Sequence, residues 1–164
     1  MPAIATRTAT TVAVKSYRPA PQLSEETEAF AANIYLDGKR AGYASNSGHG
    51  GCNRYGFDSR EQQDAFFAYA EQWGEDTGET FEPADALIAS LCENIELTKQ
   101  ARKFVKSGAA AVIFIEKTPC WFGDRAGKPD YYEDCYLLGL PAGRDPAAAA
   151  VSEGAEQWRV ISTD

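Results

Sequence analysis

The chain has 164 residues, of which 44% are hydrophobic and 24% charged, a composition typical of soluble globular proteins. This length is sufficient for one domain with a sizeable core, so we expect a single domain over residues 1–164, with a flexible start at 1–7 and a loosely ordered stretch at 141–156. No apolar run approaches the roughly 20 residues of a membrane span, and the start lacks the apolar stretch of a secretory signal. We therefore expect a cytoplasmic protein that contacts no membrane.

The net charge of −8 arises from one part of the chain. Ten acidic residues and no basic residue lie between Arg60 and Lys99. Such a segment repels the phosphates of nucleic acids and attracts basic surfaces. The charge pattern therefore argues against direct nucleic-acid binding and favours a basic protein partner, although a solvated outer helix face would also be acidic.

The first half of the sequence predicts strands and then helices. Alternating apolar residues indicate strands over Thr8–Tyr17, Ala29–Leu36 and Lys39–Ser45. The dipeptide Asp37–Gly38 is typical of a two-residue hairpin turn. The next stretch has helical spacing from Ser59, with Asp58 as N-cap and Gly74 as the expected stop.

A second helix is expected from Pro83 to Gly108, after an acidic loop at 75–82. Its acids lie at the start and its bases at the end, which complements the helix dipole. The remaining residues predict a strand buried on both faces at 109–115, a loop at 118–130, strands at 131–140 and 157–161, and a short helix from Asp145. The order of elements predicts an α+β fold with a largely antiparallel sheet and two main helices packed on one face.

The only histidine, His49, lies in a glycine-rich loop after the predicted hairpin. Backbone N–H groups of the loop glycines could form an anion nest, Arg54 could add donors, and His49 could move protons near neutral pH. The alternative is a loop whose glycines only pack against the following helix. The candidate ligand-binding residues are Asn46, Gly48, His49, Gly50, Gly51, Asn53, Arg54 and Tyr55.

Part of this region resembles a group of known sequences. Residues 37–42 read Asp-Gly-Lys-Arg-Ala-Gly, and residues 45–55 read Ser-Asn-Ser-Gly-His-Gly-Gly-Cys-Asn-Arg-Tyr. This segment, within residues 28–60, resembles small uncharacterised proteins encoded by bacteriophages and plasmids. The resemblance implies a mobile-element origin and a bacterial host. It implies no activity, so it assigns no catalytic residue.

Other chemistry has weaker support in the sequence. His49 and Cys52 could bind zinc if Cys120 and Cys135 converged on them, and Cys120 with His49 could form a nucleophile and base. Without a local motif, we expect reduced thiols, no metal, no cofactor and no catalytic residue. Glu133 and Asp134 are adjacent in a predicted strand and would face opposite sides. Aromatic residues at 121–122 and 131–132 could line a binding patch or pack in the core.

These observations predict a protein that works by binding rather than catalysis, since it has one histidine. The first hypothesis is an acidic accessory protein that modulates or inhibits a basic, nucleic-acid-handling host protein, for example in host defence. The residues expected to bind that partner are Glu71, Glu75, Asp76, Glu79 and Glu82. The alternative hypothesis is a binder of, or an enzyme acting on, a small anion such as a nucleotide, using the His49 loop.

Overall fold

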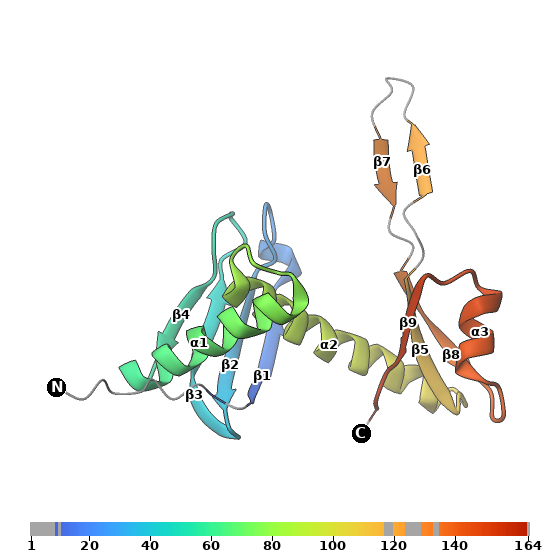
Figure 1. Ribbon diagram of the computed structural model, residues 1–164, viewed down its shortest axis with the longest axis horizontal. Coiled ribbons are helices and arrows are strands. Elements are labelled where there is room, and N and C mark those ends of the chain that lie inside the picture. Colours follow the sequence, from blue (N-terminus) through green and yellow to red (C-terminus); the bar gives the residue numbers. More distant parts are fainter. Residues whose placement is uncertain (1–8, 10, 117–119, 124–128, 133–134, 164) are drawn as a thin grey trace. The chain divides into compact units, whose positions relative to one another are not determined.

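The computed structural model describes residues 9, 11–116, 120–123, 129–132 and 135–163; for 120–123, 129–132 and 135 it describes the backbone only. The chain divides into two compact units, residues 1–94 and 95–164, which are described separately (Figure 1). Helices and antiparallel sheets occur in both, which confirms the predicted α+β class. The count of one domain stays a prediction. Among the described residues, no helix has the length and apolar character needed to cross a membrane.

The first unit contains a four-stranded antiparallel sheet with the strand order β1-β2-β3-β4. Its strands are β1 (Val12–Pro19), β2 (Phe30–Leu36), β3 (Lys39–Asn46) and β4 (Arg54–Phe57), and a short 3-10 helix, η1 (Pro21–Leu23), follows β1. The predicted hairpin between β2 and β3 is confirmed, with φ of 48° at Asp37 and 79° at Gly38. Strand β4 was not predicted. It is only four residues long and follows directly after the glycine-rich loop.

Helix α1 (Arg60–Thr77) lies across this sheet (Figure 1). Its inner face buries Phe66 and Ala70, while alternate β2 residues, among them Ile34, are buried in the sheet. The rings of Tyr55 and Phe57 from β4 lie 5.5 and 5.3 Å from the ring of Phe66. The unpredicted strand therefore supplies aromatic contacts that hold α1 on the sheet.

Helix α1 begins as expected but ends later than predicted. Ser59, rather than Asp58, is the N-cap, and its side chain accepts a hydrogen bond from the N–H of Gln62. Gly74 does not stop the helix, which continues to a left-handed cap at Gly78. A Cβ at position 74 would lie 2.7 Å from both the carbonyl oxygen of Glu79 and the Cβ of Pro83. Gly74 is therefore explained by close packing of the chain that leaves the helix, not by helix termination.

Helix α2 (Pro83–Lys106) follows the bounds expected from the sequence. Its residues up to Asn94 belong to the first unit, and those from Ile95 belong to the second. In the second unit, β5 (Ala111–Glu116) is the central strand, between β8 (Cys135–Leu140) and β9 (Gln157–Val160), with both pairings antiparallel. The short helix α3 (Pro146–Ser152) begins after Asp145, close to the predicted start, and the side chain of Asp145 caps it.

The central strand β5 is buried on both faces, which confirms the prediction. One face packs Val112 and Phe114 with Leu97 and Ala101 of α2. The other face, with Ile113 and Ile115, packs against small residues of α3. Strand β6 (Cys120–Gly123) lies within the predicted loop and pairs antiparallel with β7 (Pro129–Tyr132), which overlaps the end of that loop and the start of the strand predicted from residue 131. Strand β8 begins at residue 135.

Candidate functional site

The glycine-rich loop between β3 and β4 is held to the segment that precedes β2. The carbonyl oxygen of Gly48 accepts hydrogen bonds from the N–H groups of Glu25, Glu26 and Thr27, at 2.9, 3.0 and 3.4 Å. Gly48 has φ of 88°, and a Cβ at this position would collide with the carbonyl oxygen of Leu23. Only glycine combines this backbone conformation with so close an approach.

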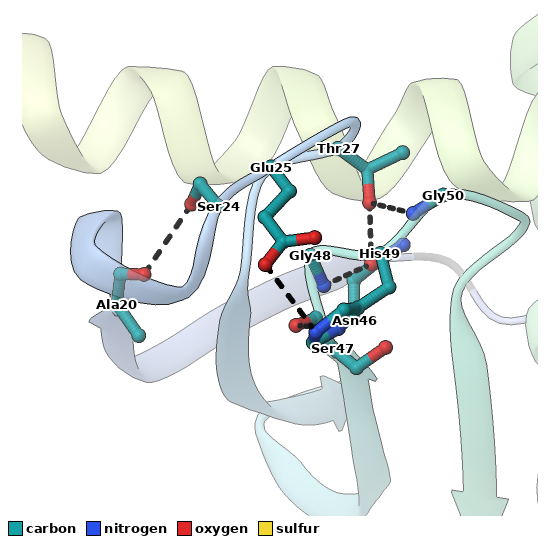
Figure 2. A network of polar contacts seen from close by, with 9 residues as sticks. All are labelled: Ala20, Ser24, Glu25, Thr27, Asn46, Ser47, Gly48, His49 and Gly50. Carbon is teal, nitrogen blue, oxygen red and sulfur yellow. Dashed lines mark hydrogen bonds and ion pairs between the residues drawn. The ribbon is translucent and has the colours of Figure 1, made fainter.

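Asn46 organises the same loop from its base (Figure 2). Its Oδ1 accepts hydrogen bonds from the hydroxyl of Thr27 at 2.7 Å and from the N–H of Gly48 at 2.9 Å. Its Nδ2 donates to the carbonyl oxygen of Gly51 at 3.1 Å and to Oδ1 of Asn53 at 3.2 Å. One side chain thus connects both sides of the loop to each other and to Thr27.

The expected anion nest is not formed by Gly48 and Gly50. The N–H of Gly48 donates to Asn46, and the N–H of Gly50 donates to the hydroxyl of Thr27 at 3.2 Å. Both donors are therefore used within the loop. Arg54 is exposed on β4, where it pairs in register with Ser45.

His49 lies on the outside of this loop, with 62% of its side chain exposed. Its Nδ1 lies 3.0 Å from the carbonyl oxygen of Ser47, so this nitrogen carries the hydrogen of the bond. Its Nε2 lies 3.8 Å from Oε1 of Glu25 (Figure 2). The imidazole thus faces a carboxylate, and an anionic ligand at Nε2 would have to approach that carboxylate.

The second half of the predicted site contacts the start of α2. The N–H of Asn53 donates to Oδ2 of Asp85 at 2.8 Å, and the hydroxyl of Tyr55 donates to Oδ1 at 2.6 Å. Burial and the hydrogen bond to Asp85 raise the pKa of Tyr55 above that of a free phenol. Asp85 therefore fixes β4 to α2, beyond the helix-dipole role that its sequence position indicated.

Cys52 also contacts the acidic segment, at Glu82 rather than at Asp85. Its thiol donates to Oε1 of Glu82 at 3.2 Å. This hydrogen bond and the charge of Glu82 raise the pKa of Cys52, so the thiol stays protonated near neutral pH. The sequence left open whether the His49 loop and the acidic segment are adjacent. The structure shows that they are in contact, through Cys52–Glu82 and Asn53–Asp85.

Zinc binding by His49 and Cys52 was considered from the sequence and not expected, and His49 belongs to no group of possible metal ligands among the described residues. The group of possible metal ligands that lie within 4.8 Å of one another there is Cys52, Glu82 and Asp85. The side chains of Cys120 and Cys135 lie outside the described part of the chain, as do the aromatic side chains of residues 121–122 and 131–132. Glu133, Asp134 and residues 1–7 also lie outside it.

All five acidic residues expected to bind a partner are exposed. Helical spacing places Asp64, Glu71 and Glu75 on the face of α1 opposite its buried residues, along about 16 Å of the helix axis. Glu71, Glu75, Asp76 and Glu79 form no ion pair with any basic side chain in the described part of the chain. We call the set Glu71, Glu75, Asp76, Glu79 and Glu82 the acidic surface.

Sequence reasoning missed Phe81, which lies between two residues of the acidic surface. Phe81 lies in the connection from α1 to α2 and is 82% exposed. An aromatic residue with acidic neighbours in a polar connection was a visible signal, because nothing in the surrounding pattern gives it a core position. Thr27, which ties the loop together, had no local signal at all.

Comparison of the chain with protein-family models, curated proteins and solved structures finds no match. The functional argument therefore rests on the geometry of the described residues.

Proposed function

We propose that this protein binds a basic partner protein through the acidic surface and Phe81. In this proposal the chain comes from a bacteriophage or plasmid, and its partner is a host protein that handles nucleic acid. The charge that repels nucleic acid is the same charge that attracts a protein evolved to bind it. Binding would modulate or inhibit that host protein.

The observation that carries the proposal is the position of Phe81. A single exposed apolar side chain is ordinary on a protein surface, but aromatic anchors dominate the energetics of interfaces, so an exposed ring set among acidic residues is well placed to anchor a basic partner. Here the exposed ring has Glu79 and Glu82 on either side of it in the chain. The arrangement supplies an apolar anchor within a surface that steers a basic protein toward it.

Unpaired carboxylates add further support. Opposite charges inside the molecule usually offset an acidic helix face, as Lys99 does for Glu96 at 2.8 Å. No such partner is described for Glu71 and Glu75, so their field is directed outward. The alternative function, binding of a small anion at the His49 loop, gains no support, because Gly48 and Gly50 donate internally and His49 faces Glu25.

The test is affinity capture from a bacterial lysate, after which the captured basic protein is purified and its affinity for this protein is measured. Wild type is compared with Glu71→Gln/Glu75→Gln, with Phe81→Ser, and with the control Glu25→Gln/Glu156→Gln. The double variants have the same net charge, so they differ only in where the charge is removed. Binding is measured at about 0.05 M and about 0.5 M salt.

A basic protein should bind wild type and the control equally at low salt. We expect the α1 double variant to weaken binding about fivefold and Phe81→Ser about 30-fold, since exposed charge pairs and aromatic anchors differ in this way. High salt should weaken all of them. Equal affinity for every variant, or affinity unchanged by salt, would refute the proposal.

A further inference from the structure

Two hollows open along the first turns of α2, both within the first unit. One has a volume of about 330 Å³ and lies against the glycine-rich loop, where Asn46, Gly51 and Asn53 line it. The other has a volume of about 650 Å³ and lies against the end of α1, where Trp73 and Thr77 line it. Both are bordered by Glu28, Ala86 and Ala89, so they adjoin along the helix. We call the two hollows together the α2 groove.

The helix presents a regular strip to this groove. Asp85, Ala86, Ala89 and Glu93 lie on one face of α2 and line one or the other hollow, and Glu82, directly before the helix, also lines the smaller one. From Asp85 to Glu93 the strip extends over about 12 Å, which is the length of about four residues of extended chain. Ala86 and Ala89 form the part shared by both hollows, and their short side chains leave room for another backbone to approach.

The groove carries only negative charge among its described lining residues. Its carboxylates come from three segments: Glu28 precedes β2, Glu79 and Glu82 lie between α1 and α2, and Asp85 and Glu93 belong to α2. No lysine or arginine of the described part of the chain lines either hollow. A concave surface with charges of one sign concentrates its field more than a flat face does.

The groove also offers an aromatic ring at one end. Trp73 is half-buried at the end of α1 and lines the larger hollow beside Glu79 and Glu93. A guanidinium group can stack on an indole while it donates to carboxylates, whereas an ammonium group lacks the planar surface for stacking. This combination favours arginine over lysine.

A metal ion is less well suited to the same place. Cys52, Glu82 and Asp85 lie close enough to share an ion, but Asp85 already accepts hydrogen bonds on both oxygens, from Tyr55 and Asn53. The thiol of Cys52 is protonated in its hydrogen bond to Glu82, whereas a metal ligand must be a thiolate. These contacts explain the cluster without an ion.

We propose that the α2 groove binds an extended, arginine-bearing segment of the partner protein. This inference rests on the proposed function and assigns to the partner a specific kind of contact, since Glu79 and Glu82 belong both to the acidic surface and to the groove. The carboxylates would bind the guanidinium groups, the alanines would contact the backbone, and Trp73 would stack on one arginine.

The experiment measures fluorescence anisotropy of a labelled peptide of about ten residues, alternating arginine and alanine, with the full-length protein at about 0.05 M salt. A second peptide carries uncharged citrulline in place of arginine. The groove variants are Ala89→Phe, which fills the groove without changing charge, and Glu28→Gln. Glu71→Gln, on α1 outside the groove, removes the same charge as Glu28→Gln and serves as the control.

Wild type should bind the arginine peptide and not the citrulline peptide. Each groove variant should weaken binding about fivefold or more, and the control less than about twofold. Equal binding of the citrulline peptide, or equal weakening by Glu28→Gln and Glu71→Gln, would overturn the inference. So would unchanged binding by Ala89→Phe.

Binding of the partner protein captured from the lysate distinguishes failure of the groove inference from failure of the proposed function. If Glu71→Gln/Glu75→Gln weakens that partner while Ala89→Phe and Glu28→Gln do not, the groove inference fails and the proposed function survives. If no variant weakens it, the proposed function fails as well. Glu28→Gln is an exposed loop substitution, so it tests the groove even where Ala89→Phe disturbs folding.

Discussion

Replacement of Asn46 by alanine should release the glycine-rich loop from the rest of the first unit. The side chain makes four hydrogen bonds, two as acceptor and two as donor. Each is worth about 0.5–1.5 kcal/mol net, and water can replace some of them at this partly exposed site. We therefore expect Asn46→Ala to lower the free energy of unfolding by about 2–4 kcal/mol.

Guanidinium unfolding gives the change in free energy, and amide hydrogen exchange shows where it arises. Exchange at Gly48 and Gly50 should accelerate by at least about tenfold, since their donors lose Asn46 directly or through Thr27. The matched control is Asn33→Ala on β2, whose side chain forms no hydrogen bond with another described residue and whose loss should cost at most about 1 kcal/mol. If Asn46→Ala costs less than about 0.5 kcal/mol or no more than the control, the role assigned to this loop is wrong.

Three further predictions concern single contacts. Gly74→Ala should lower the melting temperature although alanine favours helices by about 1 kcal/mol, because the added Cβ collides with the chain leaving α1; a higher melting temperature would contradict this packing. Tyr55→Phe should cost about 1–2 kcal/mol in chemical unfolding by removing the hydrogen bond to Asp85. Because the pKa of Tyr55 is raised in the folded state, the stability that its hydroxyl contributes should be full below about pH 10 and should decline above it. If Tyr55→Phe destabilises the protein equally above that pH, the role assigned to the hydroxyl is wrong. Cys52 should react with iodoacetamide near pH 8 more slowly than a free thiol, and Glu82→Gln should accelerate it; equal rates by mass spectrometry would show that the hydrogen bond has no effect.

The parts of the fold that could be predicted are those with a local signal. The dipeptide Asp37–Gly38 predicted the hairpin, periodic apolar residues predicted both long helices, and a continuous apolar run predicted the buried strand β5. Strand β4 (Arg54–Phe57) was not predicted, because four residues are too few to show the alternation of apolar and polar residues typical of a strand and because the strand forms only by pairing with β3. Gly74 misled the prediction because a glycine near a helix end usually marks a stop, and the contact that requires it comes from residues five and nine positions later.

The candidate site was predictable in position but not in chemistry. The glycine content correctly marked a loop of unusual conformation, since Gly48, Gly50 and Gly51 all have positive φ. The N–H of Gly50 donates to Thr27, which lies 23 residues earlier, and no local pattern reveals that partner. Asp85 looked like a residue that complements the helix dipole, and its bonds to β4 appear only once the two segments are brought together.

The anchoring of Gly48 has a consequence for anyone who labels or re-engineers this protein. A glycine-rich surface loop with a histidine is ordinarily a first choice for inserting a tag, a fluorophore or a protease site. Here the loop closes against residues 25–27 through three hydrogen bonds to one carbonyl, so lengthening it would pull apart two segments at once. The two-residue turn at Asp37–Gly38 is exposed as well, but Asp37 is hydrogen-bonded to Thr11 and Gly38 has a positive φ, so this turn is also constrained. Reporter sequences belong outside both segments, and the loop that looks most permissive should be left intact.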